Sequence, residues 1–127
     1  MIRSQKGQAT VELALSLTIL IFLIFGIIDF GRIFHAYLTL EHAGREAARI
    51  ASLGATDFEI ETRVKNSAPS LDANNISISA FPSKQNRTTG TYVTVDLTYP
   101  LTFSIPIFSS FLPDPLIIHT TTVMRVE

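Results

Sequence analysis

The chain contains no cysteine among its 127 residues. It therefore cannot form a disulfide, offer a thiol nucleophile or carry a cysteine-linked lipid anchor. Its length leaves room for one domain. Without disulfides, an exported domain of this size has to be held together by its hydrophobic core and by its neighbours.

Long runs of one charge are also missing. Ten basic and eleven acidic residues give a formal net charge of −1. Nucleic-acid-binding surfaces need clustered Lys and Arg, and the sequence contains no such cluster and no acidic tail. We therefore predict that nucleic acid is not a partner.

The sequence also lacks the common motifs of catalysis and metal binding. The sequence has no Gly-x-Ser-x-Gly elbow and no glycine-rich phosphate loop. His35 and His42 are seven residues apart and share a helix face, but neither they nor His119 has the cysteine or close carboxylate pair of a zinc site. We predict no catalytic residue, no metal site and no cofactor, and a function other than that of an enzyme.

What the sequence has instead is one long apolar run. Residues 13–28 are sixteen consecutive residues without a charge. A helix of that length covers about 24 Å, short of the roughly 30 Å hydrocarbon core of a bilayer. The longer stretch 9–30 covers about 33 Å and does span it. Glu12 and Asp29 then lie near its two ends.

Three interpretations of this apolar segment compete. A cleaved secretory signal fits poorly, because Glu12 lies on the wrong side of the run and no Ala-x-Ala-like site follows it. The second interpretation is an uncleaved membrane anchor. The third is a pilin-type signal, which is cut before the apolar helix so that the helix is kept. Arg3 and Lys6 precede the run, so the positive-inside rule places the N-terminus in the cytoplasm.

The residues just before the run favour the pilin-type signal. Gly7 has no Cβ, so its backbone is open to close approach by a protease. The carboxylate of Glu12 costs about 2.5–3.5 kcal/mol at mid-bilayer depth and less near the interface, so it needs a partner. Cleavage after Gly7 would create one, the α-amine of Gln8, which can reach Glu12 of the same helix or of a neighbouring subunit. The alternative is that Glu12 is an interfacial carboxylate without a role.

The order of motifs through residue 52 is characteristic. It reads G-Q-A-x-V-E-x-A-L, the apolar run, G-I-x-D-F-G-R-x-F-x-A-Y and A-G-R-E-A-A-R. This order resembles the TadE-like family, the minor pilins (pseudopilins) of the tight-adherence pilus system, a branch of the type IV filament superfamily. The resemblance covers about a third of the chain, from Gly7 to Ser52.

The resemblance implies roles for three residues. Gly7 would be the last leader residue and Gln8 the mature N-terminus, cut by an integral-membrane prepilin peptidase. Glu12 would be the position-five glutamate of recognition or docking. Leu13 departs from the aromatic residue common in major pilins of this system, which suggests a minor subunit. The implied partners are the prepilin peptidase, other pilins and minor pilins, inner-membrane platform proteins and the lipid bilayer.

After the apolar run the helix is expected to continue. Asp29 and Arg32, three residues apart, can meet on one helix face, as can Glu41 and Arg45, four apart. A strip of small residues follows, which another element can approach closely. It can pack under the protein's own sheet or face a neighbouring subunit. Gly54 is expected to cap the helix. The strip consists of Ala43, Gly44, Ala47, Ala48 and Ala51.

The rest of the chain predicts an α+β fold, with a short amphipathic helix and a three-stranded antiparallel sheet. Residues 56–68 form the helix, capped by Thr56 or Asp57 and stopped near Pro69. Alternating residues predict strands at 76–80, 93–99 and 117–126, the first two joined as a hairpin by a polar turn at 82–90. The last strand is expected to place one set of side chains on one face: His119, Thr121, Val123 and Arg125.

An apolar, proline-rich segment at residues 101–115 fits neither a strand nor a polar loop. Its side chains can cap the domain's own core, or they can contact a partner or the membrane surface. The side chains concerned are Phe103, Ile105, Ile107, Phe108, Phe111 and Leu112.

We predict a basic leader at 1–7, a membrane-spanning helix at 8–31 and an exported α+β domain at 32–127, in a pilin-like fold. The predicted function is that of a minor pilin or pseudopilin, processed after Gly7 and taking part in pilus assembly, adhesion or secretion. It would be a single-pass protein of the inner membrane with its C-terminal domain outside, or part of an extracellular pilus. The main alternative is an uncleaved anchor that presents a ligand- or envelope-binding domain, and an accessory enzyme is more remote.

Overall fold

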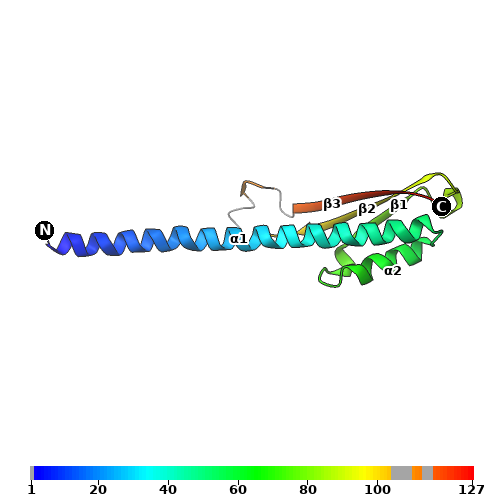
Figure 1. Ribbon diagram of the computed structural model, residues 1–127. Coiled ribbons are helices and arrows are strands. Elements are labelled where there is room, and N and C mark those ends of the chain that lie inside the picture. The colour runs from blue at the N-terminus through cyan, green and yellow to red at the C-terminus, as the bar shows by residue number, and fades with distance from the viewer. Residues whose placement is uncertain (1, 104–109, 113–115) are drawn as a thin grey trace. The chain divides into compact units, whose positions relative to one another are not determined.

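The computed structural model describes residues 2–103, 110–112 and 116–127 (Figure 1). The chain divides into two compact units, Met1–Arg32 and Ile33–Glu127. One helix, α1 (Ile2–Ser52), contributes to both units. A short helix and a three-stranded antiparallel sheet complete the second unit. The predicted α+β fold is confirmed.

The first unit consists of the apolar part of α1. Large apolar side chains from Val11 to Ile28 are exposed on all sides of the helix. The mean hydropathy of its most apolar 18-residue window is 2.6, and no part of that window is buried. A helix that is apolar all round needs an apolar environment, and its length suits a bilayer. It is therefore a candidate membrane span.

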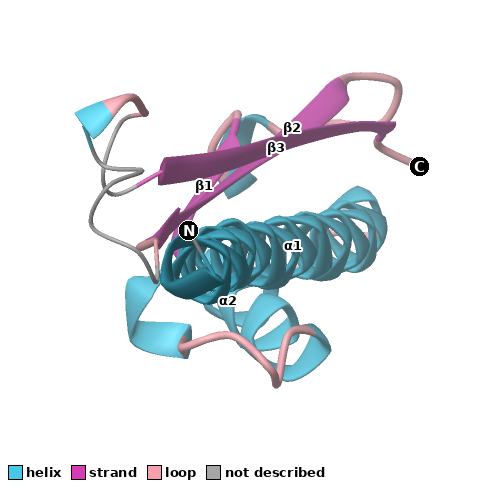
Figure 2. Ribbon diagram, turned by 90° about the vertical axis from the view of Figure 1, so that its left-hand side faces the viewer, coloured by secondary structure: helices cyan, strands magenta, loops and turns pink. Residues whose placement is uncertain are grey.

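The second unit is a helical layer against a sheet. The strands are β1 (Ser77–Phe81), β2 (Tyr92–Leu101) and β3 (Leu116–Arg125), antiparallel and in the order β1-β2-β3. Both α1 and α2 (Asp57–Ser67) lie on one side of this sheet (Figure 2). Short 3₁₀ turns, Ala73–Asn75 and Lys84–Asn86, precede β1 and β2.

Side chains alternate across the sheet as the sequence predicts. In β2 the residues Val93, Val95 and Leu97 are fully buried, while the intervening residues are half exposed. In β3 the residues Ile118 and Thr120 are buried, and the four residues expected to share a face are all exposed. A period of two with one apolar face is what a sheet covered on one side requires.

The strip of small residues on α1 packs beneath the protein's own sheet. All five of its members are buried. A Cβ added to Gly44 would lie 2.9 Å from Thr122 Oγ1 and 3.5 Å from Leu97 Cδ1. Of the two interpretations left open by the sequence, packing within the chain is therefore right. The close approach leaves Thr120 Oγ1 buried and without a hydrogen-bond partner in the described part of the chain.

The connection from α1 to α2 follows the predicted capping chemistry. Gly54 has φ = +92°, a left-handed conformation that glycine adopts without strain, and it follows the last residue of α1 by two. Thr56 is the N-cap of α2. Its hydroxyl accepts from Glu59 N at 3.2 Å, and Glu59 Oε2 accepts from Thr56 N at 2.8 Å. This reciprocal pair is a capping box.

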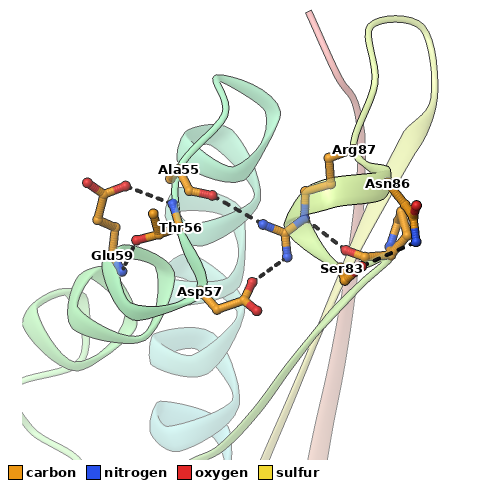
Figure 3. A network of polar contacts seen from close by, with 8 residues as sticks. Ala55, Thr56, Asp57, Glu59, Ser83, Asn86 and Arg87 are labelled. Carbon is orange, nitrogen blue, oxygen red and sulfur yellow. Dashed lines mark hydrogen bonds and ion pairs between the residues drawn. The ribbon is translucent and has the colours of Figure 1, made fainter.

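A buried arginine joins the β1–β2 connection to this helical corner (Figure 3). The side chain of Arg87 is 1% exposed. Its guanidinium donates to Pro82 O at 2.9 Å, to Ala55 O at 3.2 Å and to Asp57 Oδ1 at 2.6 Å. The sequence predicted only a polar turn at 82–90. A planar donor group that satisfies two carbonyls and a carboxylate fixes that turn against the start of α2.

The apolar segment 101–115 is only partly described. Ile105, Ile107 and Phe108 lie outside the described residues. Phe111 and Leu112 are exposed, so they do not cap the core.

Replacing Gly44 by leucine should lower the free energy of unfolding by about 2–3 kcal/mol, because the side chain has to displace Thr122 and Leu97. Leucine is a better helix former than glycine, so a loss would report packing and not propensity. The measurement is thermal unfolding of the detergent-solubilised chain by circular dichroism. Arg45→Leu, at an exposed position on the same helix, is the control and should change stability by less than about 0.5 kcal/mol. Equal stability of the two variants would contradict the close contact.

Replacing Arg87 by methionine should cost about 2–4 kcal/mol, because the carbonyls of Pro82 and Ala55 lose their donor inside the fold. Denaturant unfolding measures the change. Arg45→Met removes the same charge from an exposed pair with Glu41 and should cost less than about 1 kcal/mol. A similar effect of both substitutions would show that the buried network contributes no more than a surface ion pair.

Candidate processing and assembly segment

The three residues singled out by the sequence lie in the helical N-terminal part of α1. Gly7, Gln8 and Glu12 are all exposed. A Cβ added to Gly7 would meet no described heavy atom within 4 Å beyond the local backbone of its own helix. Packing among the described residues therefore does not require glycine at this position.

Two local features weaken the beginning of α1. Its first turn contains no acidic residue, so no side chain there complements the positive end of the helix dipole. Gly7 adds a helix-interior cost of about 1 kcal/mol relative to alanine. Both features lower the cost of local opening just before Gln8.

Glu12 and Gln8 are within reach of each other across one turn. Gln8 Nε2 donates to Glu12 Oε1 at 3.5 Å, a long hydrogen bond. Among the described residues the carboxylate has no ion-pair partner. Its neighbours Val11 and Leu13 are exposed apolar residues. The arrangement is a single acidic group on an otherwise apolar helix surface, with its charge available to a cation.

The acidic residue at the other end of the apolar run is placed differently. Asp29 is 4% exposed, and its Oδ1 lies 3.2 Å from Arg32 Nη1. The predicted pair Glu41–Arg45 also forms, at 3.0 Å. The chain therefore supplies a cation for Asp29 from within itself, and it supplies none for Glu12 among the described residues.

The histidines lie in separate places. His35 Nε2 is 3.2 Å from Ser70 Oγ, and His119 Nε2 is 3.9 Å from Asp96 Oδ1. In the ranges that the structure describes, no three His, Asp or Glu side chains come together in a way that could hold a metal ion.

A hollow of about 580 Å³ lies beside the corner between α1 and α2. Its ionisable residues are Glu59, which is engaged in the capping box, and Arg63. No motif in the sequence marks this surface. Its lining is Ile50, Ala55, Phe58, Glu59, Thr62, Arg63 and Asn66.

Comparison with known proteins gives one family. The family model described as TadE-like protein matches residues 7–49. No curated protein and no solved structure matches the chain. The matched segment begins at Gly7, contains Glu12 and the Asp29–Arg32 pair, and ends within the small-residue strip of α1. The resemblance predicted from the order of the motifs is confirmed, and this chain is TadE-like over residues 7–49.

Proposed function

We propose that the protein is a minor pilin or pseudopilin of a tight-adherence pilus, a structural subunit and not an enzyme. α1 anchors it in the inner membrane with the N-terminus in the cytoplasm, and a prepilin peptidase cuts it after Gly7. The observation that carries the proposal is the acidic side chain of Glu12 on an apolar, TadE-like helix, without an ion-pair partner in the described chain.

The surroundings of Gly7 support processing at this position. No other described residue crowds Gly7, and both the glycine and the lack of an acidic residue in the first turn lower the cost of opening the helix before Gln8. A peptidase needs its substrate backbone accessible, and both properties provide that access. The small residue then serves the active site of the peptidase, since no contact with another described residue requires glycine there.

The contact between the side chains of Gln8 and Glu12 supports the proposed docking role of Glu12. After cleavage, the α-amine of Gln8 becomes a cation close to the carboxylate of its own helix. The same amine can instead pair with Glu12 of an adjacent subunit. In an apolar helix bundle, sliding one helix along the other would leave both charges without a partner, which costs free energy. An intersubunit pair therefore sets the axial register of one helix against the next.

Assembly then exchanges lipid contacts for helix contacts. The side chains exposed around the apolar part of α1 suit both environments, because lipid tails and packed helices are similarly apolar. The partners are therefore the bilayer, other pilins and minor pilins, and the inner-membrane platform proteins. The function is participation in pilus assembly, adhesion or secretion. An uncleaved anchor that presents a binding domain is the alternative, and processing decides between the two.

The chain extracted from membranes that contain an active prepilin peptidase should begin at Gln8. Replacing Gly7 by leucine should leave the leader attached to nearly all molecules, because the peptidase no longer reaches the backbone. Intact-mass spectrometry measures both. Gly31→Leu is the matched control, since Gly31 is also a helical glycine with no atom within 4 Å of an added Cβ, and it should be processed normally. A wild-type chain that retains Met1 would favour the uncleaved anchor.

The variants Glu12→Ala and Glu12→Gln should both insert into the membrane, but they should enter sheared pili at about a tenth of the wild-type level. A tenfold loss of incorporation corresponds to roughly 1.4 kcal/mol of assembly free energy per subunit. Carbonate extraction measures insertion, and immunoblotting of the sheared fraction measures incorporation. Glu61→Ala removes the same charge from α2, where the carboxylate pairs with Lys65 at 2.7 Å, and should assemble normally. Normal assembly of Glu12→Gln would exclude a charge pair that sets the register.

A further inference from the structure

One end of the second unit exposes apolar side chains on α1. Phe34, Tyr37 and Leu38 are 55%, 43% and 48% exposed. They lie within the first two turns of the unit, which begins at Ile33. From Ile33 to Leu40 the helix has no charged residue apart from the titratable His35.

The sheet exposes apolar side chains at its corresponding end. The end of β2 pairs with the beginning of β3 through Leu101↔Leu116 and Pro100↔Ile117. Ile117 is 56% exposed, on the sheet face that points away from the helices. The connection between these strands carries the exposed Phe111 and Leu112. The sequence has no charged residue from position 97 to position 113.

Two contacts show that these features occupy the same end of the unit. Glu127 N donates to Ser52 O at 3.1 Å, and Gly44 lies against Thr122. β3 therefore runs in the same direction as α1. Ile117 lies five strand residues before Thr122, a distance of about 17 Å along β3. The same distance along α1 is about eleven helix residues, which leads from Gly44 back to Ile33. Ile117 is thus level with the first turn of α1 in this unit, as Figure 1 shows for the beginning of β3.

The apolar side chains lie on both sides of the helix-and-sheet layers. Ile117 is on the outer face of the sheet, whereas Phe34, Tyr37 and Leu38 are on the parts of α1 that the sheet leaves uncovered. A protein that docks on one face would cover only one of these sets. A surface that meets the end of the unit covers both.

The position of this end in the chain indicates what kind of surface it meets. Ile33 directly follows Arg32, where the unit containing the candidate membrane span ends. The apolar end is therefore the end attached to the span. Aromatic and aliphatic side chains around such a junction are typical of the interfacial layer of a bilayer.

We infer that the Ile33 end of the second unit inserts into the interfacial layer of the lipid bilayer, contributing side chains from α1 and from the outer face of the sheet. This inference rests on the proposed membrane anchoring by α1. It adds a second membrane contact, made by the α+β unit itself. The residues concerned are Phe34, Tyr37, Leu38, Phe111, Leu112 and Ile117.

Polar groups limit the depth of this insertion. Ser70, which bonds to His35, is exposed, and Asp72 N donates to the hydroxyl of Tyr99 at 3.4 Å. The carboxylate of Asp72 accepts from Asn74 N and Asn75 Nδ2, so this loop is a polar surface near the same end. This loop remains among the headgroups, so the insertion is limited to the interfacial layer and does not reach the hydrocarbon core.

The absence of tryptophan from the sequence makes a direct test available, because each variant carries a single reporter. The full chain is reconstituted in two kinds of vesicle, whose phospholipids carry bromine either near the headgroup end or near the middle of the acyl chains. Ile117→Trp is the probe. Tyr92→Trp is the matched control, since Tyr92 is exposed on the same sheet face and pairs with Arg125, about 26 Å along β3 from Ile117. Phe22→Trp reports insertion of the apolar helix.

Bromine near the headgroups should quench about half of the fluorescence of Ile117→Trp, and bromine near the middle of the acyl chains should quench about half of that of Phe22→Trp. Neither should change the fluorescence of Tyr92→Trp. Quenching of Phe22→Trp alone would overturn the inference and leave the anchoring intact. Absence of quenching in all three would overturn both. Protection of Ile117→Trp from aqueous iodide without quenching by lipid would mean that another protein covers this end, and would also overturn it. Phe111→Trp is read in the same way if Ile117→Trp fails to fold by circular dichroism.

Discussion

The close approach of α1 to the sheet is the constraint on which the second unit depends. Alanine and glycine on the contacting side of the helix bring its backbone near the strands, and the larger side chains come from β2. Because a Cβ on Gly44 would lie 2.9 Å from Thr122 Oγ1, glycine is what allows the helix and the sheet to lie this close. The strand positions follow from that close approach, and the Arg87 network then fixes the far corner, where α1 gives way to α2.

One helix therefore meets two different packing demands. Up to Ile28 its large side chains are exposed on every side, as an apolar solvent requires. From Ala36 onwards its buried residues recur every three to four positions, as a helix beside a sheet requires. Between these two parts of the helix, Asp29 pairs with Arg32. In the second part, the strip of small residues faces the sheet.

Much of this fold could be predicted from the sequence, because its signals are local. The alternation in β2, the capping of α2 by Thr56 and the pairing of Glu41 with Arg45 all depend on neighbours a few residues away. The Arg87 network could not be predicted, because it joins residues about thirty positions apart. The choice between the protein's own sheet and a neighbour for the small-residue strip needed the same long-range information. For the candidate site, the positions of Gly7, Gln8 and Glu12 follow from helical spacing, whereas the roles proposed for them involve other molecules, which helical spacing does not describe.

β3 has a consequence for the behaviour of the protein outside a membrane. It is ten residues long, rich in threonine and isoleucine, and it lies at the edge of the described sheet. Lysine and proline, which commonly protect such edges, are absent from it. Where copies are concentrated without lipid, this strand offers its backbone groups to the same strand of another copy. Ordered aggregation through edge pairing is therefore a hazard of this fold at high concentration without lipid.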